Sequence, residues 1–203
     1  MKKRSSLSEK TVDPDPFIQF DMWYREHSDA TPVYPDSFSL GTASGNGRVS
    51  VRTVLLKEYD RRGFVFFTNY ISHKGEQLNE NPSAAMLFYW PESSRQVRIE
   101  GSVEKISAEE STDYFVSRPR ESRIGAWASN QSKKIPGRAY LEKRFADFTL
   151  KFTGRQVPRP QYWGGFRIVP DRFEFWQEGR HRLHDRIIYL PSAGSWKISR
   201  LSP

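Results

Sequence analysis

The sequence predicts an α+β barrel, in which an antiparallel sheet closes on itself and helices are inserted in two blocks. Two observations predict this fold. From Ser37 onward, polar and apolar residues alternate with a period of two in about eight segments. Short turn sequences such as Ser44-Gly-Asn-Gly47 separate these segments, as in β-hairpins. The 203 residues show no internal repeat or linker, so we expect one domain over residues 13–203, preceded by a flexible tail at residues 1–12.

The first element should be a helix over residues 16–27. Asp13-Pro-Asp-Pro16 offers an N-cap and a proline at the first helical turn. Phe17, Phe20 and Tyr24 then recur at helical spacing. Residues 31–36 contain two prolines and are expected to form a loop.

The remaining elements follow from alternation and capping signals. Ser72 can cap a short helix that ends near Asn79, and Ser107-Ala-Glu-Glu110 is a capping box that opens a helix to Ser117. Further helices are expected over 121–128 and 138–153. The expected strands are 37–43, 48–57, 64–69, 84–90, 95–106, 163–169, 173–177, 186–190 and 196–201.

Composition excludes several classes of protein. The absence of cysteine excludes disulfides and thiolate metal sites and fits a cytoplasmic location, and the four histidines lack the spacing of a zinc hydrolase, so no metal site is predicted. No apolar run reaches membrane-spanning length. The net charge of +8 favours anionic partners. Residues 118–144 hold eight basic and two acidic residues, a local charge of +6, which fits either an anion site or a solvated basic face.

Several segments carry residues suited to anionic ligands. On a strand through residues 52–57, Arg52 and Lys57 face opposite sides, so one strand could serve two anions. The helix start after Ser72 offers free N–H groups and Lys74 to a phosphate, although this segment taken alone favours an ordinary capped helix. Tyr114, Arg118 and Ser122 recur at a spacing of four and supply phosphate donors.

The densest charged segment is Trp176–Arg186, with three arginines and two histidines in eleven residues. If the segment is extended, Arg182, His184 and Arg186 share a face. A guanidinium can stack on a flat ring while a histidine bonds a ring substituent. We therefore prefer a binding role here to an exposed charged turn.

Taken in order, these segments resemble the pyridoxine/pyridoxamine 5′-phosphate oxidase family, whose members are FMN-dependent split-barrel oxidases. The resemblance covers the chain from about Asp13 to its end and rests on the following motifs: Arg52-Thr-Val-Leu-Leu-Lys57, Phe67-Thr-Asn69, Arg95-Gln-Val-Arg-Ile-Glu-Gly101, Tyr114-Phe-Val-Ser-Arg-Pro-Arg-Glu-Ser122, Ile124-Gly-Ala-Trp-Ala-Ser129, Trp163-Gly-Gly165 and Arg182-Leu-His-Asp-Arg186. It implies an antiparallel split β-barrel with peripheral helices, and a homodimer with FMN at the subunit interface.

The resemblance also assigns residues to two ligands. The implied FMN contacts are Arg52, Thr53, Val54, Leu55, Leu56, Lys57, Phe67, Thr68, His73, Lys74, Gln96, Gln131, Ser132, Trp176 and Arg186. The implied contacts to the substrate phosphate are Lys57, Tyr114, Arg118 and Ser122, and those to its pyridine ring are Arg182, Leu183 and His184, of which Arg182 and His184 are the implied catalytic residues.

The implied reaction is oxidation of pyridoxamine or pyridoxine 5′-phosphate to pyridoxal 5′-phosphate by hydride transfer to FMN, with O₂ as electron acceptor and H₂O₂ as its product. Two alternatives stay open. One is a related split-barrel flavin oxidase that acts on another heteroaromatic ring, such as a dihydrophenazine. The other is a basic nucleic-acid-binding barrel, which the charge and the interleaved aromatic residues permit.

Overall fold

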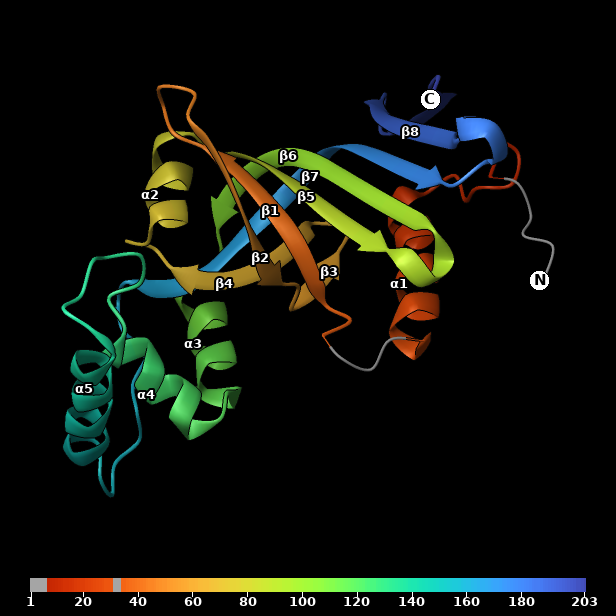
Figure 1. The fold of residues 1–203 in the computed structure, drawn as a ribbon. Coiled ribbons are helices and arrows are strands. Elements are labelled where there is room, and N and C mark those ends of the chain that lie inside the picture. Colours follow the sequence, from red (N-terminus) through yellow and green to blue (C-terminus); the bar gives the residue numbers. More distant parts are fainter. Residues whose placement is uncertain (1–6, 31–33) are drawn as a thin grey trace.

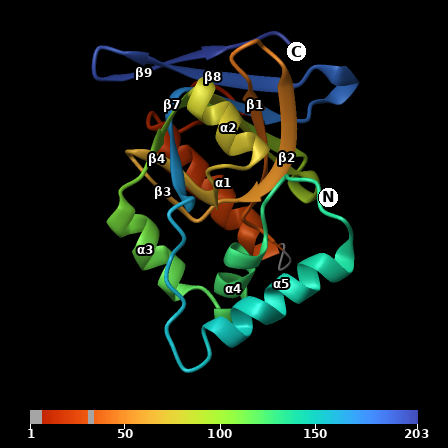
Figure 2. The same cartoon turned by 90° about the vertical axis from the view of Figure 1, so that its left-hand side faces the viewer.

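The computed structural model describes residues 7–30 and 34–203, and Figures 1 and 2 show the fold from two directions at right angles. The helices are α1 (Pro16–Ala30), α2 (His73–Glu80), α3 (Ala108–Ser117), α4 (Arg120–Ala128) and α5 (Arg138–Lys151), with short 3₁₀ turns η1 (Pro91–Ser93) and η2 (Arg180–Arg182). The strands are β1 (Ser37–Ala43), β2 (Val49–Leu55), β3 (Glu58–Asp60), β4 (Gly63–Asn69), β5 (Ser83–Trp90), β6 (Arg95–Lys105), β7 (Trp163–Gln177), β8 (Asp185–Ser192) and β9 (Ser195–Arg200).

All paired strands run antiparallel, in one curled sheet with the order β2-β1-β5-β6-β7-β4-β3. The first part of β7 pairs with β4, whereas its second part pairs with β8, which in turn pairs with β9. The sheet therefore divides along β7 into a curled body and a C-terminal hairpin (Figure 1). This arrangement confirms the predicted antiparallel α+β split barrel.

Strand β7 is a single strand of 15 residues, which corrects the two shorter strands predicted over 163–169 and 173–177. Pro170 lies in the interval that the sequence suggested as a break. Proline lacks the N–H that a sheet ladder needs, and it is tolerated at bulges. The β6–β7 register shifts at Glu100/Gly101, where Gly101 faces Pro170. The irregularity is absorbed by the register shift, and β7 stays extended.

Helix α1 packs its apolar side against the main hydrophobic core, as its periodicity predicts. Phe20 is fully buried, and Trp23 packs edge-on against Phe175 of β7 with their ring centroids 5.3 Å apart. The helix continues to Ala30, three residues beyond its predicted end.

The N-terminal segment corrects the predicted tail. Leu7 and Val12 are both buried in the main core, the Leu7 N–H donates to Asp185, and its carbonyl accepts from Arg200. The basic, polar character of this segment gave no indication that Leu7 and Val12 would be buried. Residues 7–12 are therefore packed against the C-terminal hairpin, while residues 1–6 lie outside the described chain.

Helices α3, α4 and α5 lie together at one end of the sheet and enclose a second apolar cluster (Figures 1 and 2). Two arginines join α4 and α5 reciprocally. Arg144 of α5 donates to the carbonyls of Trp127 and Ala128 at the end of α4, and Arg120 of α4 donates to the carbonyl of Phe152 after α5. Within residues 7–30 and 34–203, no helix has the length and apolar character to cross a membrane.

Candidate functional site

A cavity of about 650 Å³ lies between the sheet and the helices α3 and α4. Its lining residues are Thr53, Val54, Leu55, Lys57, Phe67, Thr68, Asn69, Lys74, Tyr114, Arg118, Pro119, Ser122, Gly125, Ala126, Ser129, Gln131 and Trp163. Three of these side chains are cationic and none is acidic. Hydroxyl and amide groups accompany the cations. The cavity is therefore suited to anionic ligands that carry phosphate oxygens.

The strand β2 and the residues after it meet the cavity as the alternation predicts. Thr53, Leu55 and Lys57 line it, whereas Arg52 and Leu56 do not; Val54 departs from the alternation, because it lines the cavity as well. Arg52 turns to the other side of the strand, where its guanidinium donates to the hydroxyls of Thr42 and Ser50, and Leu56 is buried in the main core. The two cations of this segment thus point to different surroundings.

Lys74 is 8% exposed and lies near the start of α2. Ser72 caps this helix by accepting from the Gly75 N–H. A Cβ on Gly75 would lie 2.3 Å from the Tyr70 carbonyl oxygen, so glycine is what allows the helix start to approach the end of β4. The Lys74 ammonium donates only to neutral groups, at 3.1 Å to the Thr68 hydroxyl and 3.3 Å to the Gln131 amide oxygen.

The surroundings of Lys74 perturb its titration. Burial, together with the charge of Arg52, lowers the pKa of the Lys74 ammonium to about 8. Among the described residues no carboxylate pairs with it. We call Lys74, Thr68 and Gln131 the first cradle; a bound anion would supply the charge partner that it lacks.

Arg118 forms a second cationic point, at the junction of α3 and α4. Helix α3 ends at Ser117, so Arg118 has an extended backbone instead of continuing the helical face of Tyr114. Its guanidinium lies 4.7 Å from the centroid of Trp163, and its buried Nη1 has no hydrogen-bond partner in the described chain. Burial lowers the pKa of Arg118. We call Arg118, Tyr114, Ser122 and Lys57 the second cradle.

Stacked aromatic rings form part of the cavity wall. Phe67 and Tyr114 stack with their centroids 3.9 Å apart, and Phe67 and Trp163 stack at 5.4 Å. These rings come from β4, α3 and β7, which lie far apart in sequence. A flat apolar wall next to phosphate donors suits an aromatic ligand that carries a phosphate.

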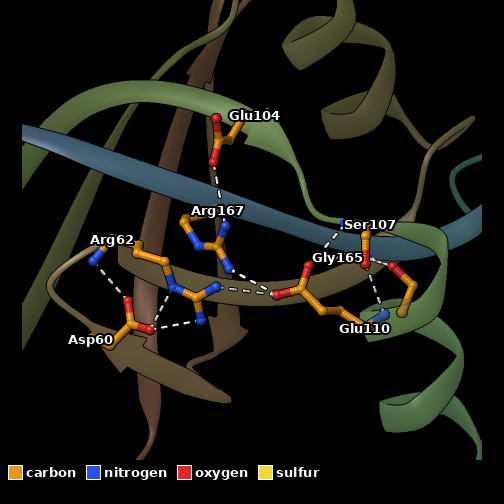
Figure 3. Close-up of polar contacts among 8 residues, drawn as sticks. Asp60, Arg62, Glu104, Ser107, Glu110, Gly165 and Arg167 are labelled. Carbon is orange, nitrogen blue, oxygen red and sulfur yellow. Dashed lines mark hydrogen bonds and ion pairs between the residues drawn. The ribbon is translucent and has the colours of Figure 1, made fainter.

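A polar cluster fixes the helix that carries Tyr114 (Figure 3). The Ser107 hydroxyl and the Glu110 carboxylate cap the start of α3 reciprocally, each over 3.0 Å. The buried Arg167 of β7 donates to Glu110 at 3.2 Å and to Glu104 at 3.3 Å. Tyr114 follows Glu110 by one helical turn, so the cluster holds it over the cavity.

A second group of predicted residues lies on β6, β7 and β8. Gln96, Trp176 and Arg186 are neighbours across these strands by register. The Arg186 Nε donates to Glu174 at 2.8 Å, and the other Glu174 oxygen accepts from Arg98 at 2.7 Å. The hydrogen bond to Glu174 raises the pKa of Arg186. These contacts fix the orientation of Arg186.

The turn at Arg182 is strained, so the condition under which Arg182, His184 and Arg186 would share a face, an extended segment, is not met. His181 and Arg182 have φ values of 58° and 62°, in the left-handed region that side chains with a Cβ avoid. Leu183 is exposed, and the ring of His184 packs against that of Trp176 at a tilt of 42°, with centroids 4.8 Å apart. The Gly179 N–H donates to His184 Nδ1 at 3.2 Å, which assigns the hydrogen of the neutral ring to Nε2.

Within one chain the two groups of predicted residues are not brought together. Both views place β8 of the C-terminal hairpin at the opposite end of the molecule from the helices α3 and α4 that border the cavity (Figures 1 and 2). His73 is exposed at the start of α2, and Ser132, with a φ of 68°, follows Gln131. Neither of the two lines the cavity.

Some lining residues had no predicted role. Asn69, Ser129 and Trp163 belong to the motifs that carry the family resemblance, so their position in those motifs was the available signal. Asp36 does not line the cavity but pairs with Lys57 at 2.5 Å, and it belongs to none of these motifs. Its position follows from the pairing of β1 with β2.

Fold and cavity together define a class: an antiparallel split-barrel protein with an anion-binding cavity walled by aromatic rings. Comparison with known proteins is more specific. The family profile described as pyridoxamine 5′-phosphate oxidase matches residues 26–152, and the profile described as the pyridoxine 5′-phosphate oxidase C-terminal dimerisation region matches residues 163–203. The chain belongs to the pyridoxine/pyridoxamine 5′-phosphate oxidase family.

Individual relatives agree with this placement. The chain is 55% identical to a pyridoxine/pyridoxamine 5′-phosphate oxidase from Paraburkholderia phymatum over 98% of this chain and 93% of that protein. It is 54% identical to one from Burkholderia mallei, over 98% and 94%. Among solved structures, PhzG from Burkholderia lata, in complex with tetrahydrophenazine-1-carboxylic acid, matches with a TM-score of 0.89 and 30% identity over 97% and 98% of the two chains.

Proposed function

We propose that this protein oxidises pyridoxamine 5′-phosphate and pyridoxine 5′-phosphate to pyridoxal 5′-phosphate, with FMN as its cofactor. The observation that supports this proposal most directly is the cavity, which has three cations, a stacked aromatic wall and no acidic lining residue. Relatives that are 54–55% identical over nearly their whole length bear the name of this activity. For the amine, the balanced reaction takes O₂ and water and gives the aldehyde, ammonia and H₂O₂.

The residues present fit FMN. A phosphate monoester needs a cation and neutral donors, which the first cradle supplies as the Lys74 ammonium and the Thr68 hydroxyl. Lys74 is buried without a carboxylate partner in the described chain, an arrangement that an arriving dianion would stabilise. When bound, the flavin supplies the hydride acceptor.

The second cradle fits the substrate's phosphate. Arg118 offers a guanidinium fork, Tyr114 and Ser122 offer hydroxyls, and Lys57 offers a point charge. This grip acts on a group that does not react, and it would set the register of the pyridine ring. Arg182 would hold the ring from the side opposite the flavin, and the Nε2–H of His184 would donate to a ring substituent.

A homodimer would bring the two groups of residues together. In the proposed arrangement the cavity of one subunit faces Gln96, Trp176 and the turn at Arg182 of its partner, with FMN at the interface. Exposed apolar side chains on the sheet support such a contact, since Val49, Val51 and Tyr89 are 83%, 70% and 60% exposed. The profile that matches residues 163–203 is described as a dimerisation region, which supports it further.

A visible spectrum tests the proposal directly. The purified protein, supplied with FMN, is expected to retain flavin absorption after the free flavin is removed. Adding pyridoxamine 5′-phosphate under air is expected to give pyridoxal 5′-phosphate and H₂O₂ in equal amounts. A protein that retains no flavin, or that retains it and leaves the vitamer unchanged, would contradict the proposal.

A second candidate function is oxidation of a dihydrophenazine, and the similarity to PhzG favours it. A dihydrophenazine has no phosphate, so it would leave the second cradle without its anion. We therefore expect the phosphorylated vitamers to be turned over with the higher kcat/KM. Parallel assays with both substrate classes decide between the two functions.

The affinity for FMN should fall as the pH rises above 8. The pKa of Lys74 is about 8 in the free protein, and a nearby phosphate dianion should raise it. Binding then takes up a proton above pH 8, so affinity should drop by up to about tenfold per pH unit until the pKa of the complex is reached. Flavin titrations of the apoprotein from pH 7 to 9.5 measure this. Lys74→Arg keeps its positive charge over this range, so its affinity for FMN should depend less on pH. Identical pH profiles for the two proteins would refute the assignment of Lys74 to the FMN phosphate.

A further inference from the structure

We propose that Asp36 is a specificity-determining residue, whose carboxylate competes with the substrate's phosphate for the ammonium of Lys57. The inference deepens the proposed function and rests on its assignment of Lys57 to the second cradle. It concerns how tightly a phosphate ester is held there, which the family placement leaves open.

The three cations of the cavity differ in their partners. Lys57 Nζ lies 2.5 Å from Asp36 Oδ2, and the two side chains are 26% and 21% exposed. Lys74 and Arg118 form no ion pair with any residue in the described parts of the chain. Asp36 does not line the cavity itself, so it reaches the site only through Lys57.

The backbone keeps this carboxylate beside Lys57. The Leu56 N–H donates to the Asp36 carbonyl at 2.7 Å, and the Lys57 N–H donates to the Val65 carbonyl at 2.9 Å. Asp36 immediately precedes the first β1–β2 pair, Ser37 with Leu55. Because these hydrogen bonds fix both backbones, the Asp36 carboxylate stays within reach of the Lys57 ammonium.

A phosphate dianion that contacts Lys57 must therefore share the ammonium with a fixed negative charge. Because the carboxylate already occupies part of the ammonium's charge and hydrogen-bonding capacity, the phosphorylated substrate and product would both bind less tightly. A ligand without phosphate does not need the ammonium, so its binding would not be weakened. Since the phosphate takes no part in bond making or breaking, the effect falls on ligand affinity and product release.

The test is the variant Asp36→Asn, studied as the full chain in excess FMN. We expect its dissociation constants for pyridoxal 5′-phosphate and for inorganic phosphate to be about three- to tenfold lower than those of the unaltered chain. Binding of pyridoxal, which lacks the phosphate, should not change. Glu58→Gln is the matched control, because it removes the same negative charge. Glu58 directly follows Lys57, is exposed and forms no ion pair in the described chain.

Two further variants keep the proposal falsifiable. In a Lys57→Met background, Asp36→Asn should lose its effect, because the competition acts through the ammonium. If Asp36→Asn does not fold, Asp36→Ser removes the same charge. Unchanged or weaker phosphate binding by a folded Asp36 variant would overturn the proposal. The measurement needs no turnover, so an inactive protein that binds phosphate more tightly would contradict the proposed function and leave the role of Asp36 intact.

Discussion

Replacing Arg182 by alanine should lower kcat/KM by about 2–4 kcal/mol of transition-state stabilisation, a loss of roughly 30- to 900-fold. In the proposed site its guanidinium holds the substrate ring against the flavin, and near-attack geometry accounts for contributions of this size. Steady-state kinetics with bound FMN verified by absorbance measure the loss. Unchanged turnover would remove Arg182 from the mechanism.

The structure separates this catalytic effect from a loss of stability. Arg182 is exposed, and in the described chain it forms no hydrogen bond or ion pair, although its backbone is held at a φ of 62°. Alanine leaves that backbone strain unchanged, so the free energy of unfolding should change by less than about 0.5 kcal/mol. Arg180→Ala is the matched control, because it removes the same charge from the same exposed turn and should retain activity.

Combining two impaired variants, assayed at a substrate concentration far below the KM of Arg118→Ala, locates Arg182 relative to the cavity. If Arg118 and Arg182 reach one site from different subunits, a dimer of one Arg118→Ala chain and one Arg182→Ala chain has one intact site. Random assembly makes about half of the dimers mixed, so co-expression should recover about a quarter of the activity. If both arginines serve a site within one chain, co-expression should recover none.

Local signals in the sequence predicted the elements and much of the cavity. Alternation through β2 separated Thr53, Leu55 and Lys57, which line the cavity, from Arg52 and Leu56, which do not, but it misplaced Val54, which lines the cavity too. The capping box at Ser107 predicted where α3 begins, since both of its hydrogen bonds are local.

Features that depend on register or on distant partners could not be predicted in this way. The pairing of Asp36 with Lys57 follows from strand pairing, and the strained turn at Arg182 lies where the sequence left the backbone conformation open. For the basic run over residues 118–144, the sequence indicated a net positive charge but no role for each residue. In the structure Arg120 and Arg144 bind helix-end carbonyls, whereas Arg118 lines the cavity, so identical residue types have different roles there.

Replacing Arg118 by alanine should raise KM for the phosphorylated vitamers by about 10- to 150-fold, because hydrogen bonds to charged groups contribute about 1.5–3 kcal/mol. The substrate's phosphate is bound alike in the ground and transition states, so kcat should change little. Arg118→Lys retains the charge but loses the guanidinium fork, and its KM should be intermediate. A fall in kcat with unchanged KM would contradict the assignment.

Thermal unfolding of the same variant distinguishes a binding arginine from a structural one. In the free chain Arg118 gains mainly its contact with Trp163, at 4.7 Å, and that cation–π interaction contributes about 0.5–2 kcal/mol. This stabilisation is opposed by the cost of desolvating the charge, since the buried Nη1 has no hydrogen-bond partner in the described chain. Because these terms oppose each other, Arg118→Ala should change the stability of the free protein far less than its affinity for a phosphate ester. A structural arginine would show the reverse, with a large loss of stability and little effect on binding.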